Sequence, residues 1–180
     1  ITLAEHASNT LPWFEVAKHT GAIIKYIDLD EEGKVTLENV RKAVTEHTKI
    51  ISLAQITNVL GYLAPIKEIC NFAHEHDIIV CVDGAQSAPH HAVDVQDLDV
   101  DFFAFSGHKM CGPTGVGVLY GKYHLLEEMT PTRFGGGSNA RYNSCGLVKL
   151  KNAPTKFETG TPNIEGVIGL GSAIEYLQNI

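Results

Sequence analysis

The sequence predicts an α/β fold with three layers, in which a mostly parallel sheet is flanked by helices. Short apolar runs alternate with amphipathic helical patterns along the 180 residues, and the run from Ile78 to Val82 is apolar throughout. A strand without polar alternation is typical of a parallel sheet that is covered on both faces. Apolar residues make up 44% of the chain and charged residues 19%, which fits one globular domain.

Helices are indicated by their capping residues and by apolar spacing. Pro12 is placed as a first-turn proline of a helix that Gly21 ends, and Thr36 and Pro65 each open a further helical pattern. A last helix is expected from Asn163 onward. The expected strands are Ala22 to Leu29, Lys49 to Ile56, Ile78 to Val82, Asp101 to Phe105 and Gly115 to Tyr120.

One long stretch, from Thr130 to Ala153, is rich in Gly, Asn and Ser and has no hydrophobic period. It predicts a long loop or an exposed hairpin, and loops of this length usually carry function.

Composition excludes several classes of partner. The net charge is −7 and no run of Lys or Arg stands out, so we expect no nucleic-acid partner. No apolar run approaches membrane-spanning length, so no membrane association is expected. Four cysteines without a C-x-x-C pair argue against a zinc site or another metal centre and against a disulfide scaffold, and they favour a reducing, cytoplasmic compartment. Cys81 lies in an apolar run and is expected to be a buried free thiol.

Polar residues at the ends of two predicted strands point to a binding site. Asp83 directly follows the run that ends at Val82, and ligands of open α/β folds bind at the carboxyl edge of the sheet. Lys109 follows the next strand, where a lysine amine can form a Schiff base if it is kept partly neutral. Ser106 and His108 could hold an anion beside it. Taken singly, Asp83 fits a turn or cap equally well, and a lone loop lysine is usually just solvated.

The run from Gly112 to Gly117 contains three glycines, which allow close backbone packing or approach to a ligand. It is not a G-x-G-x-x-G fingerprint and no helix follows it, so a nucleotide-binding Rossmann domain is a poor alternative.

Together these residues resemble the class V aminotransferase fold, and most of all the SUF-type cysteine desulfurases and the selenocysteine lyases. The resemblance extends from about Ala4 to Tyr176. Its motifs are Glu5-His6, Pro12-Trp13, Thr57 to Gly61, Val82 to Gln86, Asp101 to Lys109, Gly112 to Gly115, Gly135 to Gly137 and Phe157 to Asn163. The fold it implies is the large cofactor domain of a fold-type I transferase that uses pyridoxal 5'-phosphate (PLP).

The resemblance also implies roles for three residues in the chemistry. Lys109 would form the Schiff base with PLP and later move protons at the substrate Cα. Asp83 would pair with the protonated pyridine nitrogen, because a nearby carboxylate keeps the ring cationic and able to accept electrons. His6 would stack on the cofactor ring.

Further cofactor contacts follow from the same resemblance. Gln86 would hydrogen-bond the phenolic oxygen, and Asn58 would lie near that oxygen and the substrate carboxylate. Ser106 and His108 would bind the phosphate. Thr161 would reach the phosphate of a neighbouring subunit, which implies a homodimer.

The implied activity is conversion of L-cysteine to L-alanine, with the sulfur passed as a persulfide to an acceptor protein for iron–sulfur cluster assembly. The family's phosphate-binding loop, sulfur-accepting cysteine and substrate-binding arginine are not visible here, and Cys145 does not match the cysteine motif. Residues 1–180 are therefore expected to be the central part of the large domain, without its N-terminal segment and C-terminal small domain. A selenocysteine lyase, another class V enzyme or a non-catalytic truncated domain are the alternatives.

Overall fold

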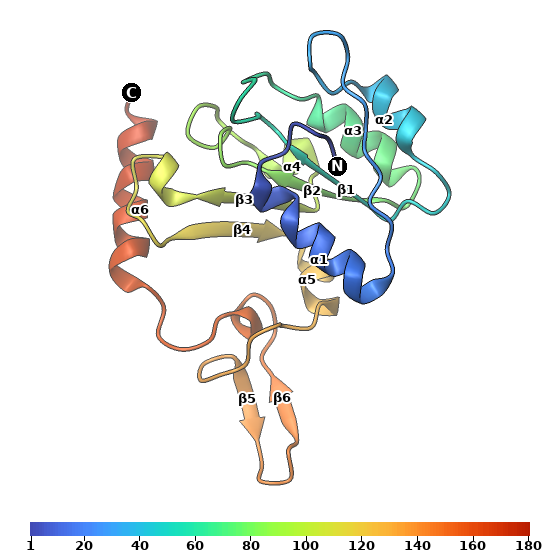
Figure 1. Ribbon diagram of the computed structural model, residues 1–180. Coiled ribbons are helices and arrows are strands. Elements are labelled where there is room, and N and C mark those ends of the chain that lie inside the picture. Colours follow the sequence, from blue (N-terminus) through green and yellow to red (C-terminus); the bar gives the residue numbers. More distant parts are fainter.

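The computed structural model describes residues 1–180 and contains a mixed sheet with helices around it (Figure 1). The sheet has four strands in the order β1-β2-β3-β4. They are β1 (Ile50–Ala54), β2 (Ile79–Asp83), β3 (Phe102–Ser106) and β4 (Gly117–Gly121). The pairs β1–β2 and β2–β3 are parallel and β3–β4 is antiparallel, which confirms the expected mostly parallel sheet.

One face of the sheet forms the main core with α2 (Leu37–Ala43) and α3 (Ile66–His74). The α3 side chains that face the sheet lie three or four positions apart, which is the spacing of one helix face. They are Ile66, Ile69, Cys70 and Ala73, all buried. The expected cap at Thr36 is present, since its hydroxyl accepts a hydrogen bond from the Asn39 N–H at 3.2 Å.

The N-terminal segment lies against the other face, through η1 (Ala7–Asn9) and α1 (Leu11–Thr20), so that the sheet is the middle of three layers (Figure 1). The Ser52 hydroxyl in β1 donates to Asn9 Oδ1 at 2.6 Å. Gly21 ends α1 with a φ of 75°, a left-handed conformation that glycine adopts without strain.

The remaining elements follow the sheet or connect its strands. They are α4 (Val95–Leu98), η2 (Gly107–Lys109), α5 (Tyr123–Glu128), β5 (Asn139–Tyr142), β6 (Val148–Leu150), η3 (Thr155–Phe157) and α6 (Ile164–Gln178). Strands β5 and β6 pair antiparallel and project away from the main sheet (Figure 1). The glycine-rich stretch is thus an exposed hairpin, one of the two forms that its sequence predicted.

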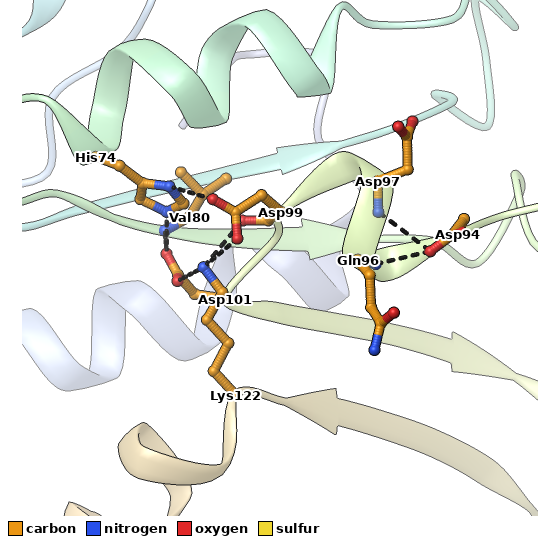
Figure 2. A network of polar contacts seen from close by, with 8 residues as sticks. All are labelled: His74, Val80, Asp94, Gln96, Asp97, Asp99, Asp101 and Lys122. Atoms are coloured by element: carbon orange, nitrogen blue, oxygen red, sulfur yellow. Dashed lines mark hydrogen bonds and ion pairs between the residues drawn. The ribbon is translucent and has the colours of Figure 1, made fainter.

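Four ionisable residues join at the amino ends of β2 and β3, and we call them the amino-edge network (Figure 2). The two ring nitrogens of His74 lie 3.0 Å from Asp99 Oδ2 and 2.9 Å from Asp101 Oδ2. Lys122 Nζ lies 2.7 Å from Asp99 Oδ1 and 2.9 Å from Asp101 Oδ1. Asp101 also accepts the Val80 N–H at 2.7 Å, so the network ties α3, β2, β3 and the end of β4 together.

Two expectations about local structure were wrong. Ala22 to Leu29 forms no strand: only Ile27 pairs, in a single bridge with Thr2, and Ile23 is 91% exposed. A strand needs a hydrogen-bonded partner strand along its length, and here only Thr2 pairs with the segment. Cys81 is half-buried rather than buried, whereas Cys70 on α3 is fully buried; both are free thiols. No helix is long and apolar enough to span a membrane.

Candidate functional site

Three parallel strands end side by side and place Asp83 in the middle of one sheet edge. Ala54 of β1 pairs with Asp83 of β2, which pairs with Ala104 of β3. The ladder continues beyond the strands, because the Gln55 N–H donates to the Asp83 carbonyl at 3.0 Å and the Gly84 N–H donates to the Ala104 carbonyl at 2.8 Å. Residues that directly follow these strands therefore gather at this carboxyl edge.

Lys109 lies at the end of η2, the short helical turn that follows β3 at this edge. Ser106 and Lys109 are half-buried and His108 is exposed. The turn is closed by the Gly112 N–H, which donates to the Gly107 carbonyl at 3.0 Å. A Cβ at position 112 would lie 2.8 Å from that carbonyl oxygen, so only glycine fits there. Close backbone packing, one of the two roles expected of these glycines, holds the lysine turn in shape.

Charged and polar groups at this edge have few partners within the chain. Lys109 takes part in none of the ion pairs. The Asp83 carboxylate accepts one hydrogen bond, from the Ala85 N–H at 2.9 Å. Gln55 Oε1 is the one buried side-chain polar atom without a hydrogen-bond partner. Buried polar atoms are nearly always paired, and the exception here belongs to a residue that directly follows β1 at the same sheet edge as Asp83.

Three more predicted residues belong to segments that end at the same edge. Asn58 is exposed and follows β1, and Gln86 is half-buried and follows β2. His6 is exposed and caps η1, where its Nδ1 accepts the Ser8 N–H at 3.1 Å. Its neighbour Glu5 accepts the Ala54 N–H at 2.8 Å, which fixes this segment beside the residue that pairs with Asp83.

Thr161 is not joined to this group. It is exposed, on the stretch that leads from η3 to α6. That stretch is tied to the base of the hairpin, since the Gly160 N–H donates to the Gly136 carbonyl at 2.8 Å. No group of three or more His, Cys, Asp or Glu side chains is arranged to hold a metal ion.

Sequence reasoning missed two residues of this region, Gln55 and Glu5. Gln55 directly follows β1 in the structure, but it lies inside the strand expected from Lys49 to Ile56, so the sequence did not place it at the strand's end. Glu5 was noted only as part of a motif, because its contacts with Ala54 and Asn9 depend on how η1 packs against the sheet.

Comparisons with known proteins agree with this geometry. The family model described as Aminotransferase class-V matches residues 1–180. A probable cysteine desulfurase of Halalkalibacterium halodurans is 53% identical over 182 residues, which cover all of this chain and 44% of the relative.

Two solved structures are also similar. The cysteine desulfurase CsdA from Escherichia coli, in its S-sulfonic acid form, has a TM-score of 0.96 and 43% identity over 99% of this chain and 45% of its own. The apo cysteine desulfurase from Thermococcus onnurineus NA1 has a TM-score of 0.93 and 38% identity over 99% and 44%. The chain spans less than half the length of these proteins. Because the family model matches the whole length of the chain, the chain belongs to the class V aminotransferase family.

Proposed function

We propose that the carboxyl edge binds PLP and that the protein is a cysteine desulfurase, which converts L-cysteine to L-alanine. The observation that carries the proposal is a half-buried lysine without an ion-pair partner, at the same sheet edge as a carboxylate with one hydrogen bond and an unpaired buried amide oxygen. The amine and the carboxylate fit a cofactor that carries an aldehyde and a basic ring nitrogen. The desulfurase names of relatives at up to 53% identity support the substrate.

Asp83 would hold a proton on the ring nitrogen of the cofactor. Its position between β1 and β3 keeps its backbone fixed by ladder bonds on both sides, and its second carboxylate oxygen is free to accept. Bound PLP supplies an electron sink for negative charge that develops at the substrate Cα. A carboxylate opposite the ring nitrogen maintains that capacity because it favours the cationic ring.

Lys109 would hold the cofactor covalently and then move a proton at the substrate Cα. An amine does this only while it is partly neutral, and a carboxylate paired with it would favour its charged form. The absence of such a pair fits the role. The rigid glycine turn from Gly107 to Gly112 would limit the positions that the amine can reach.

The other predicted residues would orient the cofactor. Ser106 and His108 precede Lys109 and would bind the phosphate, while Gln86 and Asn58 would bind the phenolic oxygen and the substrate carboxylate. His6 would stack on the ring. Thr161 would serve a second subunit of a homodimer, which suits its exposed position. A cysteine thiol would take the sulfur from the substrate as a persulfide, while the substrate carbon would keep the electrons of the broken C–S bond and gain a proton to give alanine. The sulfur would then pass to an acceptor protein for iron–sulfur cluster assembly, in the cytoplasm.

The test is PLP uptake by the full-length protein and by its Lys109→Ala variant, each treated with borohydride. We expect a visible absorption band that borohydride bleaches, with cofactor left covalently attached to the wild type alone. Retention of covalent cofactor by the variant would remove Lys109 from its role. Alanine formed from L-cysteine but not from other amino acids would then separate a desulfurase from other class V activities, and L-selenocysteine would test the lyase alternative.

A further inference from the structure

The Glu5 carboxylate accepts three hydrogen bonds and belongs to no ion pair between side chains. Its Oε1 accepts from the Thr2 hydroxyl at 2.7 Å, and its Oε2 accepts from Asn9 Nδ2 and from the Ala54 N–H, both at 2.8 Å. Asn9 extends the network, because its Oδ1 accepts from the Ser52 hydroxyl at 2.6 Å and from Trp13 Nε1 at 3.3 Å. Glu5 and Asn9 thus fasten the N-terminal segment to β1 across more than 40 positions of sequence.

Placing a carboxylate here has an energetic cost. Burial raises the pKa of Glu5, and the hydrogen bonds from Asn9, Thr2 and the Ala54 N–H lower it by less than burial raises it. A group that is desolvated yet bound by three donors fixes geometry more than it adds stability.

Glu5 fixes the position of the residue that follows it, His6. Ala54, which donates to Glu5, is the register partner of Asp83. His6 follows Glu5 directly and is the N-cap of η1, and Asn9, the last residue of η1, also donates to Glu5. Both ends of this short turn are therefore fastened to the strand beside Asp83, while the imidazole itself stays exposed.

We propose that Glu5 is a positioning residue that holds His6 over the cofactor ring at the carboxyl edge. It acts through the length of its side chain, which lets its oxygens reach their donors, and not through its charge. This inference rests on the proposed function. A positional role for Glu5 requires the length of its side chain, whereas an electrostatic role requires its charge. Two conservative variants, each of which keeps one of these properties, separate the two roles.

Glu5→Gln keeps the length of the side chain and removes its charge: the amide oxygen can accept from Ala54 and Asn9, and the amide nitrogen can donate to Thr2. Glu5→Asp keeps the charge but is one CH₂ group too short to reach the Ala54 N–H from the same backbone position. Glu15→Ala, which changes an exposed glutamate on α1, is the matched control.

The experiment measures the PLP dissociation constant and the visible circular dichroism of bound cofactor in the full-length protein. We expect Glu5→Asp to weaken PLP binding roughly tenfold, the scale of one lost stacking contact, and to reduce the dichroism of the bound cofactor. Glu5→Gln and Glu15→Ala should stay within about twofold of the wild type.

A double-mutant cycle with His6→Ala completes the test. If Glu5 acts through His6, Glu5→Asp has no further effect on binding once His6 is alanine. Equal effects in both backgrounds would overturn the proposal, and so would weakening by Glu5→Gln but not by Glu5→Asp. A wild-type protein that takes up no PLP would overturn the proposed function as well, whereas normal uptake with independent effects of the two residues would overturn only the role of Glu5.

Discussion

The two ends of the parallel strands carry similar chemical groups in opposite environments. At the amino ends, His74, Asp99, Asp101 and Lys122 face one another at 2.7 to 3.0 Å (Figure 2). At the carboxyl ends, Lys109 has no ion pair and Asp83 accepts a single hydrogen bond. The ladder that runs between the edges is the same, so the difference lies in the residues that follow or precede each strand.

We propose that this difference separates stability from function within one sheet. Charged groups that satisfy one another hold elements together, and groups that are left unsatisfied are available to a ligand. The amino-edge network surrounds an aspartate whose side chain is only 7% exposed, so removing one member leaves others without partners. We therefore expect substitutions at one edge to affect unfolding and those at the other to affect activity.

Asp83→Asn should have the largest effect, and on activity alone. The amide can still accept the Ala85 N–H, so we expect the free energy of unfolding to change by less than about 0.5 kcal/mol. Loss of the carboxylate should reduce alanine formation from L-cysteine on the order of a hundredfold, the scale of one lost electrostatic contribution to catalysis. Steady-state rates and urea unfolding on the same sample check both parts; a large loss of stability would make Asp83 a structural residue.

Asp101→Ala should have the largest effect on stability. It removes the acceptor for the Val80 N–H and leaves Lys122 and His74 with one carboxylate between them. Breaking a buried pair from one side typically costs about 3 kcal/mol or more. Urea unfolding of the apoprotein measures this, and a change below about 1 kcal/mol would show that the amino-edge network does not hold the sheet.

Acidification should weaken the amino edge. Burial by itself raises the pKa of Asp101, but hydrogen bonds from the Val80 N–H, Lys122 and His74 together bring it below its ordinary value. The hydrogen bond from Lys122 is the main cause that lowers the pKa of Asp99. Groups with lowered values contribute stability that is complete above the ordinary aspartate pKa of about 3.9 and is lost as the pH falls through the folded value.

The free energy of unfolding should thus fall as the pH drops below about 4, and part of that fall should be missing in Asp101→Ala. Urea unfolding at a series of pH values tests this. Parallel curves for the two proteins would mean that the network contributes nothing to acid sensitivity.

Lys67→Ala should have the smallest effect and serves as the control for the amino edge. Lys67 on α3 pairs with Asp97 on α4 at 2.6 Å, but the two side chains are 53% and 60% exposed. Exposed pairs contribute between about 0 and 1 kcal/mol. If Lys67→Ala lowered the free energy of unfolding as much as Asp101→Ala does, ion pairs near α3 would stabilise the protein whether or not they are buried.

Sequence alone located the carboxyl edge better than the amino edge, for a physical reason. Asp83 directly follows an apolar run and Lys109 follows the next one after three residues, so strand direction places both at one edge whatever the packing. The amino-edge network joins residues from four elements, and its pairing depends on how α3 and the end of β4 meet the sheet. The same dependence on a neighbour explains why Ala22 to Leu29 was wrongly expected to be a strand, whereas the strands of the sheet were found.

The strand order has a consequence for biosynthesis. Each strand of the sheet pairs with the one made just before it, so the sheet can grow in the direction of translation without waiting for distant segments. Asn58, Asp83 and Lys109 then reach the site in that order as the chain leaves the ribosome. The residue proposed to bind the cofactor covalently is the last of the three, so a nascent chain would have Asp83 in place before Lys109 arrives.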